Sequence, residues 1–174
     1  RKLRSGRFEV HCGGTLINHN TILTAAHCLQ DKPGIQPITH VRLGDHDITT
    51  TDDGAENVDF TIAQKIKHPY WNPTTLDNDI AIIKLDGTVT YTTGIAPICP
   101  PDDYKDRTIS KLLRGNQPTV VGWGETKEGS GSQDILRQAR VPMVAQKRCK
   151  KNYQGVQDVT ISDIHLCAGN TKRD

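Results

Sequence analysis

The sequence predicts an all-β fold. Its apolar stretches are short and are separated by turns rich in glycine, proline, asparagine and serine, a pattern typical of β-sandwiches and β-barrels. Helix signals are scarce, and the sequence contains neither an internal repeat nor a low-complexity segment. At 174 residues, the chain is long enough for one domain with a substantial core.

The N-terminal half supplies four predicted strands. Thr15–Ile17 and Thr21–Thr24 flank the polar turn Asn18–Asn20, which predicts a β-hairpin. Apolar and polar residues alternate in Val41–Leu43 and again in Phe60–Ala63. Because side chains of a strand point alternately to its two faces, this period also indicates strands.

Further strands are predicted on both sides of a long connection. The continuous apolar run Ile80–Leu85 is expected to form a strand buried on both faces. The segment 97–118 is rich in proline and polar residues and is predicted to join two halves of the fold. Beyond it, Thr119–Gly124 and Ile135–Val144 are predicted to form strands, separated by a turn at Gly129–Ser132.

The best helix candidate is Val144–Gln154, which Gly155 would end. Cys149 and Tyr153 would face inward on this helix, and its basic residues would face outward. These are Lys147, Arg148, Lys150 and Lys151. Since basic side chains on a helix are more often a solvated face than an anion site, the solvated face is the favoured interpretation.

Charge and hydropathy exclude some partners. Lysine and arginine number 22 against 20 aspartates and glutamates, and the formal net charge is only +2, so we expect no nucleic-acid and no membrane partner. The apolar runs are far shorter than the roughly 20 residues of a membrane-spanning helix. The chain opens on a basic stretch, Arg1 to Arg7, without an apolar region behind it, so no N-terminal signal segment is expected.

The chain has five cysteines, an odd number. Two pairings would close short loops, Cys12 with Cys28 and Cys149 with Cys167, and each would stabilise the fold by about 3 kcal/mol in the chain-entropy model. Two such disulfides suggest a secreted, extracellular protein, in which Cys99 would pair outside these residues. A buried free thiol is the alternative for Cys99. The spacings do not indicate a zinc site, since neither CxxC nor HxxxH occurs.

The segment Thr24–Cys28 holds the candidate catalytic group. An imidazole titrates near neutral pH, so His27 could accept a proton and return it during a reaction. A disulfide between Cys28 and Cys12 would hold the backbone that carries the ring. Because His27 is one of seven histidines, its assignment depends on the motifs around it.

Five motifs follow one another along the chain: CGGTLI at Cys12–Ile17, LTAAHC at Leu23–Cys28, DNDIAIIKL at Asp77–Leu85, VGWG at Val121–Gly124 and CAG at Cys167–Gly169. In this order the chain resembles the chymotrypsin/trypsin-like serine endopeptidases, from about Phe8 to Asp174. The resemblance implies two antiparallel β-barrels. Residues 1–95 would form the first barrel, 96–116 the connection, and 117–174 an incomplete second barrel.

The resemblance also implies roles for two residues in a serine-type endopeptidase. His27 would take the proton of a serine hydroxyl as general base and would then give it to the leaving amine. Asp79 would hold the other ring nitrogen, which fixes the tautomer and stabilises the imidazolium. No cofactor is required for this chemistry.

The nucleophile of this chemistry is missing from the sequence. In the family it lies in a Gly-Asp-Ser-Gly-Gly-Pro segment, and the 174 residues contain neither this segment nor an Ile-Val-Gly-Gly activation sequence. We therefore expect a partial catalytic domain of a zymogen, with the nucleophilic serine beyond the C-terminus. The 174 residues alone are expected to be inactive.

Two residues refine the expected type. Asp174 falls where trypsin-like members carry the aspartate of the primary pocket, which pairs with an arginine or lysine of the substrate and disfavours apolar side chains. Cys99 resembles the cysteine that bridges to an N-terminal propiece or light chain. Together with VRLGDHD at Val41–Asp47, it favours the arthropod clip-domain proteases of clotting and immune cascades. Protein or peptide substrates and serpin-type inhibitors are the further partners implied.

The acidic segment Asp45–Glu56 lies where many trypsins bind calcium. Carboxylate oxygens on a flexible loop suit a hard cation, and the loop supplies such side chains at Asp47, Asp52, Asp53 and Glu56. A structural calcium ion is one interpretation, and a solvated acidic loop is the favoured one. No other metal site is expected.

Two other functions remain open. A non-catalytic serine-protease homologue, acting as a cascade cofactor or binding protein, could keep His27 and Asp79 and carry glycine in place of the serine. The residues after Asp174 in the whole gene product would distinguish it from a protease. A histidine-based metal protein is a weaker alternative, which a zinc-binding assay would test.

Overall fold

The structure is a computed structural model that describes residues 10–30, 37–100, 117–127, 129–156, 160–163 and 165–169. The basic N-terminal stretch, most of the predicted connection and Asp174 therefore lie outside the described residues. The chain divides into two compact units, Arg1–Pro100 and Pro101–Asp174. The predicted division at residues 95 and 117 stays a prediction. No helix in the described part is long and apolar enough to cross a lipid bilayer.

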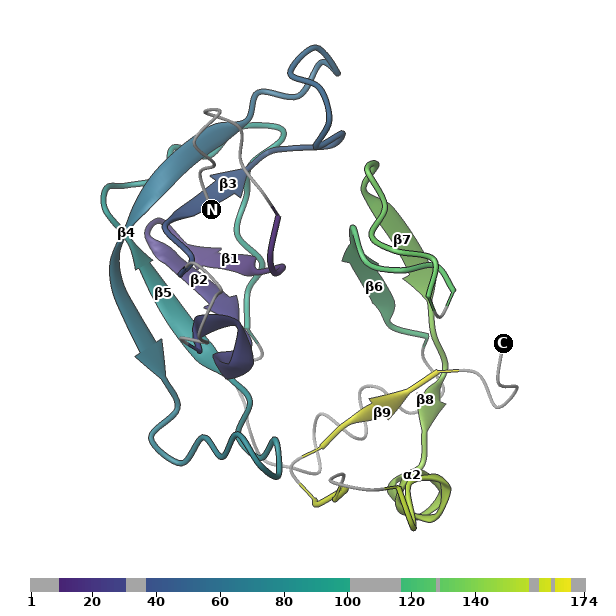
Figure 1. The fold of residues 1–174 in the computed structure, drawn as a ribbon. Helices are drawn as coiled ribbons and strands as arrows, with labels where there is room; N and C mark the ends of the chain where they lie inside the picture. Colours follow the sequence, from purple (N-terminus) through teal and green to yellow (C-terminus); the bar gives the residue numbers. More distant parts are fainter. Residues whose placement is uncertain are drawn as a thin grey trace. The chain divides into compact units, whose positions relative to one another are not determined.

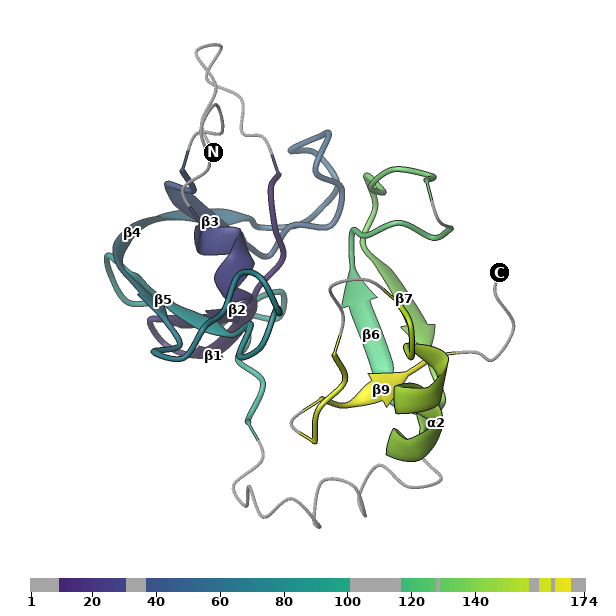
Figure 2. The ribbon, with the colours of Figure 1, turned by 60° about the horizontal axis from the view of Figure 1, so that its bottom comes forward.

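The first unit is built on a curled sheet of five antiparallel strands in the order β1-β2-β5-β4-β3 (Figure 1). The strands are β1 (Thr15–Asn18), β2 (Thr21–Thr24), β3 (His40–Leu43), β4 (Val58–Lys67) and β5 (Ala81–Leu85). A single 3-10 turn, η1 (Ala26–Leu29), follows β2. Figure 2 shows the strands curving around one side of this unit. The all-β class and the predicted hairpin of β1 and β2 are confirmed.

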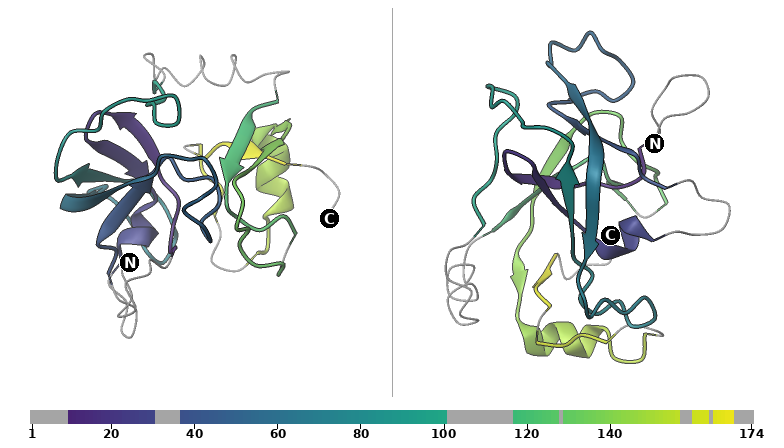
Figure 3. Two further views of the ribbon diagram at one scale, coloured as in Figure 1. Left: turned by 90° about the horizontal axis from the view of Figure 1, so that it is seen from above. Right: turned by 90° about the vertical axis from the view of Figure 1, so that its left-hand side faces the viewer.

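The curl of the sheet originates in β4, the longest strand (Figure 3). Its first part pairs with β3, where Thr61 lies opposite His40, and its second part pairs with β5 from Ile62 onward. The register shifts between Ile62 and Gln64. A β-bulge of this kind bends a strand and increases its twist, so one strand can serve two partners that do not pair with each other.

The core of the first unit lies on the concave side of this sheet. β5 alternates between buried and half-buried residues, so the expectation of a strand buried on both faces is wrong. Antiparallel sheets bury one face, and Ile80, the first residue of the apolar run, is 45% exposed and lies outside the strand. The buried residues come from most of the elements: Leu16, Ile22, Ala26, Leu29, Ala81, Ile83, Leu85, Val89 and Ile95.

The second unit contains two small antiparallel ladders and one short helix among its described residues. β6 (Thr119–Gly122) pairs with β7 (Arg137–Arg140), and β8 (Met143–Val144) pairs with β9 (Cys167–Ala168). The helix α2 (Gln146–Asn152) is shorter than predicted, because Val144 belongs to β8. This unit is an incomplete barrel.

Only one of the two residues predicted for the inner face of α2 is buried. Cys149 is buried and forms a disulfide with Cys167. Tyr153 is the C-terminal cap residue of the helix and is 45% exposed, so its predicted inward position is wrong. The helix ends at Asn152. The amide of Tyr153 closes the last turn by donating to the carbonyl of Cys149 at 3.1 Å, and the Tyr153 side chain stays exposed.

Candidate functional site

The sheet register brings His27 and Asp79 together. β2 and β5 are antiparallel, and Thr24, the last residue of β2, lies opposite Ala81, the first residue of β5. The residues that follow β2 and the residues that precede β5 therefore lie close together, at the same end of these two neighbouring strands. His27 comes three residues after Thr24, and Asp79 comes two residues before Ala81, so both residues lie at this end of the two strands.

One carboxylate holds both the ring and the backbone of His27. Asp79 Oδ2 lies 2.6 Å from His27 Nδ1, and Asp79 Oδ1 accepts a hydrogen bond of 2.8 Å from the backbone amide of His27. Two bonds from different parts of one residue fix its position and the rotation of its ring. With the carboxylate ionised, Nδ1 carries the hydrogen and Nε2 is left with its lone pair, which is the tautomer a general base requires.

The imidazole is accessible from solvent. The side chain of His27 is 52% exposed and that of Asp79 is 26% exposed. Nε2 lies 3.6 Å from Cys28 Sγ, a disulfide sulfur without a hydrogen to donate. A hydroxyl group that approaches Nε2 from solvent would therefore meet an available proton acceptor.

The segment around His27 is anchored on three sides. Ala26 is fully buried in the core, and Cys28 is bonded to Cys12 as predicted. Thr24 donates a hydrogen bond of 2.8 Å from Oγ1 to the carbonyl of Gly13. Gly14 lies just before β1, and a Cβ there would lie 2.6 Å from a methyl group of Ile22 on β2, so this close approach favours glycine.

The sulfur and nitrogen atoms near His27 do not form a metal site. Ligand atoms of Cys12, His27 and Cys28 lie within 4.8 Å of one another, a grouping that could suggest zinc. Both sulfurs belong to one disulfide, however, and a metal requires thiolates. The grouping therefore offers a metal one imidazole, which is too few protein ligands for zinc.

A closed loop places Asp79 at the start of β5. The amide of His68 donates to the carbonyl of Ile80 at 3.0 Å, and the amide of Asn72 donates to the carbonyl of Asp77 at 3.0 Å. Asp77 accepts a hydrogen bond of 2.9 Å from Thr75 Oγ1. Sequence reasoning missed Asn78, whose φ of 57° is left-handed. Asparagine tolerates this region better than most residues, and that was the available signal.

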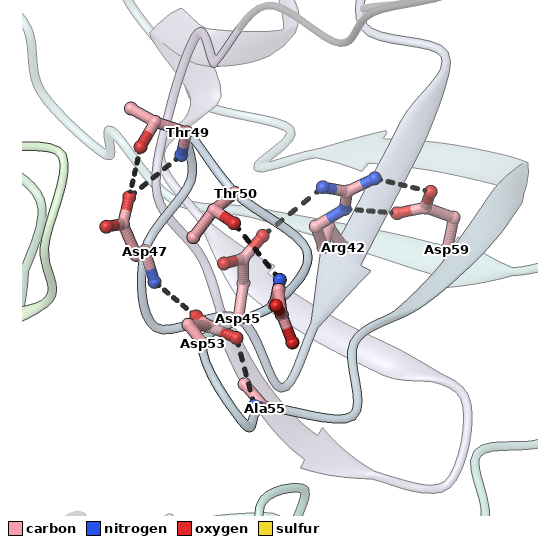
Figure 4. A network of polar contacts seen from close by, with 9 residues as sticks. Arg42, Asp45, Asp47, Thr49, Thr50, Asp53, Ala55 and Asp59 are labelled. Carbon is pink, nitrogen blue, oxygen red and sulfur yellow. Dashed lines mark hydrogen bonds and ion pairs between the residues drawn. The ribbon is translucent and has the colours of Figure 1, made fainter.

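The acidic segment Asp45–Glu56 uses its carboxylates internally (Figure 4). Asp47 accepts hydrogen bonds from the hydroxyl and the amide of Thr49, and Asp53 accepts hydrogen bonds from the amides of Asp47 and Ala55. These bonds lower the pKa of Asp47, chiefly through the Thr49 hydroxyl, and the pKa of Asp53, chiefly through the amide of Asp47. Protein donors thus occupy oxygens that a cation would need, and a calcium site stays a prediction.

Arg42 closes the base of this loop. Its Nε and Nη2 bind the two oxygens of Asp59 at 2.7 and 2.8 Å, and its Nη1 lies 3.3 Å from Asp45 Oδ2. The bonds to Asp59 and then those to Asp45 raise the pKa of the guanidinium. The side chain of Asp45 is 3% exposed, and its Oδ1 has no hydrogen-bond partner among the described residues.

Two further residues were singled out from the sequence, Cys99 and Asp174. Cys99 is free and exposed, so the alternative of a buried thiol is wrong. It lies near the end of the first unit, where the carbonyl of Leu16 holds the amide of Ile98 at 3.0 Å. Asp174 lies outside the described residues, and its place in a substrate pocket stays a prediction.

Comparison with known proteins gives one consistent match. The sequence model of a family described as Trypsin matches residues 2–174. The proclotting enzyme of Tachypleus tridentatus is 34% identical over 170 residues, 95% of this chain and 44% of that protein. The CLIP domain-containing serine protease B4 of Anopheles gambiae is 33% identical over 176 residues, 97% of this chain and 48% of that protein.

A vertebrate protein gives a similar match. Trypsin-2 of Salmo salar is 32% identical over 158 residues, which are 91% of this chain and 60% of that protein. The chain therefore spans about half of the length of the curated relatives that it matches.

Proposed function

Because the chain belongs to the trypsin family of serine proteases, we propose that the protein containing these residues is a serine endopeptidase with His27 as its general base and Asp79 as its orienting acid. Trypsin-family serine proteases are hydrolases that act on protein substrates and need no cofactor. The observation that carries the proposal is the distance of 2.6 Å between His27 Nδ1 and Asp79 Oδ2.

The two residues would act in sequence. His27 Nε2 takes the proton of a serine hydroxyl while the serine oxygen attacks the carbonyl carbon of the substrate, and the imidazolium then gives this proton to the leaving amine. The substrate acyl group is then bound to the serine as an ester. A water molecule attacks this ester while His27 takes its proton, and His27 returns the proton to the serine as the acyl group leaves as a carboxylic acid. Asp79 stabilises the imidazolium through Oδ2 and holds the backbone of His27 through Oδ1. The ring therefore keeps its orientation in both protonation states.

The nucleophile must come from another part of the protein. The serines in the 174 residues are Ser5, Ser110, Ser130, Ser132 and Ser162, and none stands in a Gly-Asp-Ser-Gly-Gly context. We therefore expect the 174 residues to be inactive by themselves, since base and acid without a nucleophile lose most of the covalent route.

Asp174 supports a preference for arginine and lysine. A carboxylate at the base of a substrate pocket pairs with a cationic side chain, and an apolar side chain would leave it buried and unpaired. The preference rests on the sequence, in which Asp174 follows Lys172 and Arg173.

The cysteines support the cellular setting of the proposal. Two disulfides, Cys12–Cys28 and Cys149–Cys167, suit an oxidising, extracellular compartment. The exposed thiol of Cys99 suits a covalent link to an upstream propiece or light chain, as in a zymogen-derived protease. Substrates and serpin-type inhibitors of a proteolytic cascade are the remaining proposed partners, supported by the similarity to the proclotting enzyme.

The test compares the full-length activated protein with its His27→Ala variant on arginyl, lysyl and apolar peptide substrates. We expect the wild-type protein to hydrolyse the arginyl and lysyl substrates and the variant to lose activity by a factor on the order of 10⁴ or more. The Asp174→Ser variant should lose the preference for basic residues and keep its fold. The isolated 174-residue chain should hydrolyse none of the substrates.

His40→Gln is the matched control, because His40 lies on β3, which β4 separates from β5 in the sheet. It should retain wild-type activity. Full activity of His27→Ala would contradict the proposed role of His27. A folded full-length protein that is inactive and carries glycine in place of the serine would instead support the non-catalytic homologue.

A further inference from the structure

The residue before Asp79 has an unusual backbone conformation. Asn78 has φ of 57°, in the left-handed region, where few residues other than glycine lie without strain. Asparagine is among those that tolerate it best. The conformation recurs two residues earlier at Leu76, with φ of 60°, so the chain reverses sharply just before Asp79.

Asp79 is the central residue of a tight turn. The amide of Ile80 donates to the carbonyl of Asn78 at 2.7 Å, which closes a three-residue γ-turn around Asp79. The direction of the Asp79 side chain therefore depends on this turn, whose first residue is Asn78. Since Asp79 makes two hydrogen bonds to His27, a rotation of this turn would displace both bonds together.

The side chain of Asn78 fixes this turn to the loop. Its Nδ2 donates a hydrogen bond of 2.9 Å to the carbonyl of Tyr70, on the opposite side of the loop that begins at His68. The loop thus has cross-links at its base, between His68 and Ile80, and beside Asp79, through Asn78. The second cross-link comes from a side chain, so a single substitution can remove it without changing the chain's path.

We propose that Asn78 is a positioning residue for the His27–Asp79 pair. It combines a left-handed backbone, which leads the chain into the turn around Asp79, with a side-chain amide that anchors the first residue of this turn to Tyr70. The inference deepens the proposed function and rests on it for the catalytic consequence, whereas the effect on the His27 ring follows from the geometry alone.

Three substitutions separate the two parts of this role. Asn78→Gly allows the left-handed backbone and removes the bond to Tyr70. Asn78→Asp keeps the shape and much of the backbone tolerance, but it turns an oxygen towards the Tyr70 carbonyl instead of a donor. Asn78→Ala removes the bond and also disfavours the left-handed conformation. The disturbance should therefore be larger for alanine than for glycine.

Thr75→Val is the matched control in the same loop. It keeps the branched shape and removes the hydroxyl that donates to Asp77 Oδ2 at 2.9 Å. This substitution should weaken the loop without touching Asn78, Asp79 or the bond to Tyr70.

The experiment uses the full-length activated protein with ¹⁵N-labelled histidine. Imidazole nitrogen shifts report the tautomer of neutral His27, and we expect hydrogen on Nδ1 in the wild-type protein and in Thr75→Val. All three Asn78 variants should show a mixture of tautomers. Their kcat on an arginyl peptide should fall at least about tenfold with KM nearly unchanged, because misalignment by a fraction of an ångström is costly and Asn78 would act through Asp79.

Two outcomes would overturn the inference. One is wild-type tautomer and kcat in Asn78→Gly and Asn78→Asp. The other is an equal loss in Thr75→Val at equal thermal stability, which would indicate a purely structural loop. If the wild-type protein is inactive on every substrate, the proposed function fails, and the tautomer of His27 still decides whether Asn78 positions the pair.

Discussion

At the scale of single residues, two side chains of the first unit each form hydrogen bonds to two different partners. Asp79 divides its oxygens between the ring and the amide of His27, and Arg42 divides its donors between Asp59 and Asp45. A planar guanidinium can make such a fork, whereas an ammonium group binds as a point charge. Each of these residues therefore depends on its exact side-chain geometry as well as on its charge.

The substitution Arg42→Lys tests this dependence. Lysine keeps the charge but cannot span both oxygens of Asp59 and reach Asp45, so we expect the free energy of unfolding to fall by about 1 to 3 kcal/mol. Denaturant unfolding of the full-length protein would measure it. Arg140→Lys, on the exposed strand β7, is the control and should change stability by less than about 0.5 kcal/mol. Equal effects of the two substitutions would contradict the importance of the fork.

At the scale of elements, the loops carry the candidate chemistry and the strands position it. Asp79 lies in the loop from His68 to Ile80, and His27 lies in the turn η1. The loop Asp45–Glu56 is organised by its own carboxylates, which bind backbone amides and a hydroxyl. Gly44 begins this loop with φ of 73°, where a Cβ would lie 2.8 Å from the carbonyl of Glu56. The loop is therefore compact at its base.

The acidic loop should respond to pH. The pKa values of Asp47 and Asp53 lie below their usual value in the folded loop, so both carboxylates favour the folded form above about pH 4. This contribution is lost as the pH falls through the folded-state pKa values. The amide NMR shifts of Asp47 and Ala55, which both donate to Asp53, should follow this transition as the pH falls below about 4.

Two variants of the loop check this assignment. In Asp53→Asn, the amide shifts of Asp47 and Ala55 should no longer change at acidic pH, because the carboxylate that they bind is absent. Asp52→Asn is the neighbouring control, since Asp52 contributes its backbone amide to Thr50, and it should retain the transition. If both amide shifts in Asp53→Asn changed with pH as they do in the wild-type protein, the assignment would be refuted.

At the scale of the whole molecule, the two units differ in how completely they are built. Among the described residues, the buried core cluster lies in the first unit. In the second unit, Val120, Val121 and Leu166 are 57%, 58% and 60% exposed. A two-stranded ladder cannot bury both of its faces, so this unit has the strands of a barrel without its closed interior.

Cys99 gives a prediction at this scale. If it links the catalytic chain to an upstream piece, the activated full-length protein should migrate as one species on a non-reducing gel and as two after reduction. Cys99→Ser should separate the pieces without reductant. A double Cys149→Ser, Cys167→Ser variant, which removes a disulfide within the second unit, should keep them linked. Two separate species from the non-reduced wild-type protein would disprove the link.

Much of the fold could be predicted from local pattern. The β1–β2 hairpin follows from two short apolar runs around a polar turn, and both disulfides follow from the short loops that they close. The errors have physical causes. The sequence pattern places Ile80 in a buried apolar run, but the strand begins only after the turn around Asp79. Tyr153 reads as a helix residue, but the last turn of α2 ends before it.

From the sequence alone come the all-β class, the two disulfides and, through the resemblance to a protease family, the two residues of the candidate pair. Apolar period, loop length and short motifs can be recognised without knowledge of the fold. Only the tertiary structure decided how the pair is made. His27 and Asp79 are 52 positions apart, and the register of β2 against β5 brings them together. The Asp79 carboxylate then binds both the ring and the backbone amide of His27. Such bonds join distant segments, and local periodicity does not encode the pairing that aligns them.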